Sequence, residues 1–164
     1  FIVTIKALAP AVVFDWQMTD RDGNSGTITH TPAAMMSGDI MYNYFSPGAK
    51  TLGDHTISVW ISKNSFTSLT KKPMSVIMVM NTNEAPRKMG ITAAEAERDD
   101  PGVLKIIVNG EKETIEEKVV VELNDEGQKV ADGPMFSFYN SAKIPIILRM
   151  HNGFDIVLKE IKTK

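Results

Sequence analysis

Hydrophobic and polar residues alternate in the first part of the chain. In the stretch AVVFDWQMT the large apolar residues share one side: Val12, Phe14, Trp16 and Met18. A period of two predicts a half-buried strand. GTITHT, residues 26–31, is rich in Thr and Ile and predicts a second strand. The polar stretch DRDGNSG lies between the two strands, so the pattern predicts a hairpin.

Two interruptions of this alternation predict short helices. Thr31 is a helix-capping residue, and Pro32 suits the first helical turn ahead of several Ala and Met residues. Ser62 caps a second segment, in which Phe66 and Leu69 lie three residues apart and share one helical face. Both segments lie in the N-terminal half of the chain.

The remaining segments also predict strands. Asn109 and Gly110 separate two strand-like runs, and both residues accept the positive φ of a tight hairpin turn. PMSVIMVM, residues 73–80, is apolar on both faces and predicts a central strand. HTISVWIS, residues 55–62, alternates again, with Ile57, Val59 and Ile61 expected inward.

These patterns predict a mainly β fold, an antiparallel sandwich or barrel-like sheet, with one or two short helices in the N-terminal half. At 164 residues the chain is expected to form a single β-rich domain over 1–164. The turn-rich residues 81–90 mark the expected boundary if the domain has two lobes.

Composition narrows the functional classes. Hydrophobic residues make up 43% of the chain, the net charge is -2 and the pI is about 5.9, which does not suggest a nucleic-acid or anionic-membrane binder. The absence of cysteine excludes disulfides, zinc–thiolate sites and cysteine nucleophiles. FIVTIKALAP, residues 1–10, is too short to span a bilayer and contains Lys6, so no transmembrane segment is predicted.

DRDGNSG is the strongest candidate for a metal site. Asp20, Asp22 and Asn24 offer side-chain oxygens at alternate positions, as calcium loops do. The acidic residue that closes such a loop is missing, and the flanking segments are strands. We therefore favour a hairpin tip, with calcium as the only cofactor under consideration.

The three histidines do not follow a metal-binding spacing. No GxSxG elbow and no phosphate-binding glycine loop is present. A hydrolase remains an alternative only if a site is assembled in space from His30, His55 and a carboxylate such as Asp54.

Aromatic residues supply the candidate binding surface. Alternation in residues 55–62 would place Trp60 outward, where a tryptophan often marks a binding surface, unless the short helix that carries Phe66 covers it. Tyr42 and Phe45, together with nearby methionines, form either an adaptable apolar patch or part of the core.

SVWISKNSF and IPIILRMHNGFDIVLKEI resemble segments of a group of uncharacterised exported β-rich proteins of Bacteroidetes-type bacteria. The resemblance implies a β-rich domain exported to the periplasm or cell surface, and it implies no catalytic residue.

The sequence therefore predicts a non-enzymatic binding or structural module of the bacterial cell envelope, with a protein or cell-surface partner. One alternative is the hydrolase above. Another is a subunit of a self-assembling or multi-protein surface structure, which the acidic middle and basic tail of the chain would suit.

Overall fold

The structure is a computed structural model that describes residues 1–20, 24–72, 74–97 and 102–163. Within these residues the helices are α1 Pro32–Ser37, α2 Lys63–Thr70 and α3 Ala93–Ala96. The strands are β1 Ile2–Ala7, β2 Val12–Gln17, β3 Ser25–His30, β4 Ile40–Met41, β5 Gly48–Thr51, β6 Thr56–Ile57, β7 Ser75–Val79, β8 Pro86–Gly90, β9 Gly102–Val108, β10 Glu111–Glu122, β11 Met135–Tyr139, β12 Ile147–His151, β13 Asp155–Val157 and β14 Glu160–Thr163.

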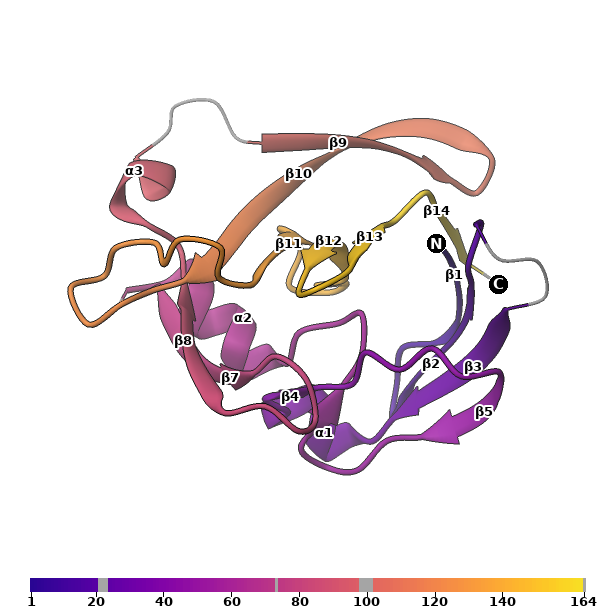
Figure 1. The fold of residues 1–164 in the computed structure, drawn as a ribbon. Coiled ribbons are helices and arrows are strands. Elements are labelled where there is room, and N and C mark those ends of the chain that lie inside the picture. The colour runs from indigo at the N-terminus through magenta and orange to yellow at the C-terminus, as the bar shows by residue number, and fades with distance from the viewer. Residues whose placement is uncertain (21–23, 73, 98–101, 164) are drawn as a thin grey trace.

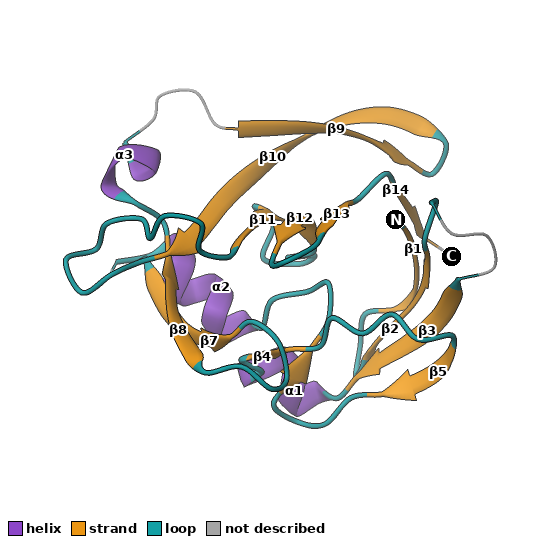
Figure 2. Ribbon diagram, viewed as in Figure 1, coloured by secondary structure: helices purple, strands orange, loops and turns teal. Residues whose placement is uncertain are grey.

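All described strands belong to one sheet. Its order is β5-β3-β2-β1-β14-β9-β10-β8-β7-β4-β6, and β11, β12 and β13 branch from β10. Figures 1 and 2 show this sheet following a curved path around β11–β13. The mainly β prediction is confirmed. The sheet is not closed, because β5 and β6 at its two ends do not pair with one another within the described chain.

The last strand joins the two halves of the molecule. β14 lies between β1 and β9 and runs parallel to both. The ends of the chain are correspondingly close: the Phe1 ammonium donates to the Val157 carbonyl at 2.8 Å, and the Lys159 amide donates to the Phe1 carbonyl at 2.8 Å. Parallel neighbours were not part of the antiparallel expectation, since residue patterns do not reveal which strands pair.

Both predicted hairpins are confirmed. β2 and β3 pair antiparallel with Trp16 opposite Gly26. A side chain at position 26 would place its Cβ 2.6 Å from the Gly48 carbonyl oxygen, so this close approach of β3 to β5 requires glycine. β9 and β10 are joined by Asn109 and Gly110 with φ of 51° and 89°.

The helices begin where their capping residues predict. The Thr31 hydroxyl accepts from the Ala34 amide at 3.1 Å, and the Ser62 hydroxyl accepts from the Ser65 amide at 3.3 Å. The third helix, α3, was not predicted, although Thr92 caps it in the same way. Among the described residues, no helix has the length and apolarity needed to cross a membrane.

The expected boundary at residues 81–90 is in part a strand. β8 pairs antiparallel with β7 and also with β10, where Gly90 lies opposite Val121. Met89 is buried, and Arg87 pairs with Glu122 of β10. Turn residues at the start of this segment close a hairpin, and the segment thus connects neighbouring strands.

Residues 55–62 depart from the predicted strand. Only Thr56–Ile57 form a strand, because Val59 adopts a φ of 44° and interrupts the alternation. As a result Trp60 turns inward and is fully buried, with its ring stacked 6.0 Å from Phe14. Its backbone pairs with Ile146, so this segment ties the N-terminal strands to the C-terminal part of the core.

β7, which falls within the run predicted as a central strand, lies between two strands, as predicted. β7 pairs with β8 on one side and β4 on the other. Its two faces are not equally buried: Met78 is buried, whereas Ile77 is 58% exposed.

Candidate ligand-binding pocket

A pocket of about 320 Å³ lies where three distant segments meet. We call it the aromatic–acidic pocket. The β2–β3 hairpin contributes Met18, Asp20 and Asn24; residues 43–46 follow β4; and Phe154–Ile156 lead into β13. Two of its lining residues are bonded to each other, since the Met18 amide donates to the Asn24 carbonyl at 2.9 Å.

Three aromatic rings line the pocket, and two of them pack against aromatic side chains of the core. Phe45 packs edge-on against Trp16 at 5.3 Å, and Tyr44 packs edge-on against Tyr42 at 5.5 Å. Phe154 stands on the opposite segment and is half-buried. Because Trp16 and Tyr42 are buried, the rings of Tyr44 and Phe45 rest on the core while their outer surfaces remain accessible.

The polar lining is acidic. It contains the carboxylates of Asp20 and Asp155 and the amides of Asn24 and Asn43, and none of the described lining residues is Lys or Arg. The Oδ1 atom of Asp155 lies 2.8 Å from His151 Nδ1. The other oxygen of Asp155 has no hydrogen bond or ion pair within the described chain, so it is available to a ligand.

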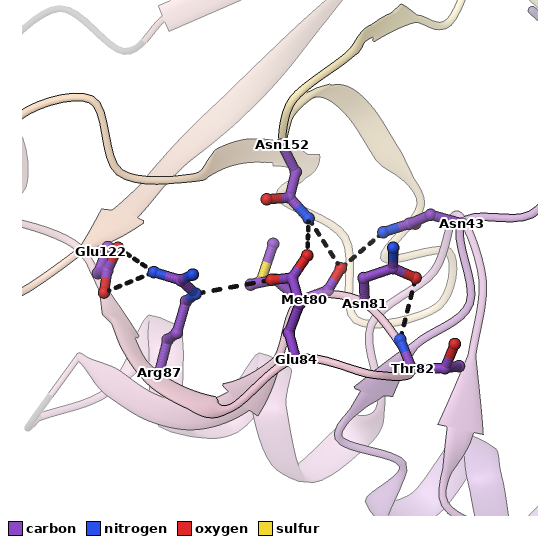
Figure 3. Close-up of polar contacts among 8 residues, drawn as sticks. All are labelled: Asn43, Met80, Asn81, Thr82, Glu84, Arg87, Glu122 and Asn152. Carbon is purple, nitrogen blue, oxygen red and sulfur yellow. Dashed lines mark hydrogen bonds and ion pairs between the residues drawn. The ribbon is translucent and has the colours of Figure 1, made fainter.

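A polar network fixes the β12–β13 turn beside this pocket (Figure 3). The Met80 carbonyl accepts from Asn43 Nδ2 at 2.6 Å and from Asn152 Nδ2 at 3.2 Å. It therefore connects the segment after β4 with the turn that precedes Phe154. Because both amides donate to one carbonyl, the two walls of the pocket are held at a set separation.

The same network continues to β10. Arg87 donates to both oxygens of Glu122 at 3.1 and 2.9 Å, and its Nε lies 3.7 Å from Glu84 Oε2. Glu84 in turn accepts from Asn152 at 3.5 Å. Both bonds to Glu122 come from Arg87 Nη1, and through Glu84 this charged group is connected to Asn152 of the β12–β13 turn.

The calcium prediction gains no support from the described geometry. Asp20 and Asn24 line the pocket, whereas Asp22 lies outside the described residues. No group of three or more His, Asp or Glu residues that would suit a metal occurs among those described. The calcium site therefore stays a prediction.

The three predicted binding residues lie in different environments in the structure. Trp60 is buried and offers no surface, which corrects the outward orientation expected from alternation. Tyr42 is also buried, and its hydroxyl accepts from Lys50 Nζ at 2.6 Å. Phe45 alone lines the pocket, although Tyr42 supports the neighbouring Tyr44.

The residues proposed for a hydrolase site are divided between the core and the surface. His30 is fully buried, and its Nε2 accepts from the Ser58 amide at 2.9 Å. Burial lowers the pKa of His30 to about 4. Asp54 and His55 are exposed, and Asp54 accepts from the Thr31 hydroxyl at 2.7 Å. None of these residues lines a described pocket together with another.

A second hollow of about 380 Å³ lies on the other side of His151. Ser137 donates to Glu117 Oε2 at 2.7 Å, and Arg149 Nε lies 3.2 Å from the same oxygen. The three side chains form a satisfied polar contact beside an apolar floor.

Sequence reasoning did not identify Tyr44, Phe154 or Asp155 as site residues. Phe154 is half-buried and directly follows the tight turn at Gly153, whose φ is 72°. The turn at Gly153 is therefore the feature of the sequence that could have indicated the partial exposure of Phe154.

Comparison of the chain with family models, curated proteins and solved structures finds no match in any of the three.

Proposed function

We propose that this protein is a non-enzymatic binding module of the bacterial cell envelope, which captures a cationic group of its partner in the aromatic–acidic pocket. The observation that carries the proposal is the pocket lining: two carboxylates and three aromatic rings, without a lysine or arginine among the described lining residues. Carboxylates attract a cation, and aromatic faces add a cation–π contribution once the cation is desolvated. The envelope location is supported by the resemblance to exported proteins.

The ligand that suits this pocket is an ammonium or guanidinium group, such as a lysine or arginine side chain of a protein partner. A pocket of about 320 Å³ admits one such side chain. Asp20 and Asp155 would attract the charged group, and Tyr44, Phe45 and Phe154 would supply apolar contact for the alkyl stem.

The geometry favours binding over the two alternatives. The hydrolase alternative needs His30, Asp54 and His55 in one cleft, but His30 lies in the core. Self-assembly through strand addition needs an open edge. The edge strand β5 has only four residues, all exposed, and carries Lys50, which disfavours edge-to-edge pairing.

The test compares two ligands of nearly equal shape. Arginine amide carries the guanidinium, whereas citrulline amide replaces it by a neutral urea. Calorimetric titration should show arginine amide binding at least about tenfold more tightly, because the neutral analogue loses the charge attraction. Equal binding of the two, or no binding of arginine amide, would reject a cationic ligand.

Three variants locate the effect. Asp155→Asn should weaken arginine amide about tenfold, since it removes one carboxylate and keeps the side-chain shape. Asp125→Asn, in an exposed turn outside the pocket, is the matched control and should leave binding unchanged. His151→Gln separates the charge of Asp155 from its contact with His151, and it should weaken binding less than Asp155→Asn.

A further inference from the structure

The outer face of the β9–β10 hairpin is cationic and partly apolar. Residues directly opposite in this antiparallel pair share one face: Val103 with Glu116, Lys105 with Thr114, and Ile107 with Lys112. Val103 is 51% exposed and Ile107 is 38% exposed. We call this the lysine face.

Three lysines surround Ile107. Lys112 lies directly across the strand pair, and Lys105 lies two positions earlier on the same strand and the same face. On the other side of β9, the Ile107 amide donates to the Lys159 carbonyl at 3.0 Å. All four residues line one shallow hollow of about 560 Å³.

None of these three lysines has an ion pair among the described residues. Glu113 lines the hollow with them, whereas Glu116 and Glu160, which lie on the same face, pair with Lys118 and Lys162. A cationic area thus exists on a chain whose net charge is -2. Net charge did not reveal it, because the positive charges are brought together by the register of two strands and by the position of Lys159.

The chemistry of this face selects its partner. A second copy placed face to face would bring lysines against lysines, which is unfavourable. The face of one two-stranded ribbon covers roughly 200 Å² from strand spacing and rise. A stable protein interface buries about 800 Å² on each side. An anionic lipid surface needs no shaped counterpart, attracts all three lysines at once and accepts exposed aliphatic side chains.

We propose that the lysine face docks on an anionic lipid bilayer, with Lys105, Lys112 and Lys159 at the headgroups and Ile107 in contact with the acyl boundary. Lysine stems follow an apolar surface while their ammonium groups stay among the headgroups. This docking is independent of the aromatic–acidic pocket, which is built from other segments.

The test is sedimentation of the protein with vesicles. Vesicles of phosphatidylglycerol and phosphatidylcholine should bind about 100-fold more protein than phosphatidylcholine alone, as three lysines near an anionic surface imply. Raising the salt from 0.1 to 0.5 M should remove most of the difference. Equal binding to both vesicles would overturn the proposal.

Variants decide which residues are responsible. Lys112→Glu should lower binding to the anionic vesicles about tenfold or more, and Ile107→Ser should lower it less. Lys63→Glu, at the exposed start of α2, is the matched charge control and should bind as the unchanged protein does. Equal loss with Lys63→Glu would overturn the assignment to this face, and unchanged binding of Ile107→Ser would overturn the contact of Ile107 with the bilayer. Circular dichroism and urea unfolding establish that each variant is folded.

Discussion

The aromatic–acidic pocket and the lysine face carry opposite charge on one protein, and they are built in different ways. The pocket joins Met18, Asp20 and Asn24 with residues 43–46 and 154–156, which are far apart in the chain. The lysine face is formed by a single hairpin and Lys159 of a neighbouring segment. Each region therefore depends on a different class of contact.

This difference predicts which kind of substitution disrupts each region. Long-range packing and the Met80 network position the pocket, so changes in the core should damage it first. Strand register and one tight turn position the lysine face, so a change in that turn should damage it while the pocket remains. Four changes test this separation.

Trp16→Ala should have the largest effect. It removes a buried ring that supports Phe45, and loss of a buried aromatic side chain should lower the free energy of unfolding by about 3–5 kcal/mol. Binding of arginine amide should fall with it, while amide hydrogen exchange in β9–β10 stays slow under native conditions. Trp16→Phe, which keeps a ring, should lose less. If amide exchange were equally fast around the pocket and in β9–β10, the two regions would not be independent of each other.

Acid should destabilise the protein through His30 of β3. The pKa of His30 is about 4 in the fold and near 6.5 when unfolded, so the unfolded chain binds a proton first as pH falls. Stability is full above pH 6.5 and should decrease by about 3 kcal/mol as the pH falls to 4. Urea unfolding at several pH values measures this slope. His30→Gln, which keeps an acceptor for the Ser58 amide, should make the free energy of unfolding depend less on pH. If the dependence on pH is unchanged in this variant, other groups are responsible for the acid effect.

Gly110→Ala tests the turn of the lysine face. At a φ of 89° an alanine should cost about 1–2 kcal/mol of folding free energy. Vesicle binding should weaken, and binding of arginine amide should not. Gly127→Ala is a matched control, since Gly127 has a φ of 78° in another turn. Loss of vesicle binding in the control as well would show that general destabilisation is responsible.

Asn152→Ala should have the smallest effect on stability. It removes one of two donors to the Met80 carbonyl, a loss of about 1 kcal/mol. Affinity for arginine amide should nevertheless decrease, because the turn before Phe154 is less firmly held. Asn140→Ala removes a comparable bond, to Glu116 at 3.0 Å, outside the pocket. Thermal unfolding measures the stability of both variants, and titration measures their affinity for arginine amide. Equal loss of affinity in Asn152→Ala and Asn140→Ala would contradict this prediction.

Local features of the fold were predictable from the sequence. The hairpin turns and the caps of α1 and α2 depend on residues with special backbone preferences, and each is visible within a few positions. Trp60 was not predictable, because alternation assumes a regular strand and Val59 breaks it with a positive φ. One backbone angle reverses the orientation of the residue that follows.

The site was predictable only in fragments. Asp20, Asn24 and Phe45 were identified separately, for a metal and for an apolar surface, and the structure places them in one pocket. Asp155 completes the pocket from more than a hundred residues away, and nothing in the local sequence reveals that contact. The lysine face was missed for the same reason, since Lys159 lies 47 positions from Lys112.

The position of β14 also has a consequence for how the protein is made. Among the described strands β1 is synthesised before all the others, yet β14, which lies between β1 and β9, is synthesised after all the others. Until then the nascent chain presents two unpaired strand edges, which invite association with other chains. We expect the insertion of β14 to wait for the synthesis of this strand, and to be slow because it joins residues separated by most of the given sequence. A chaperone that shields strand edges during translation would therefore raise the yield of native protein.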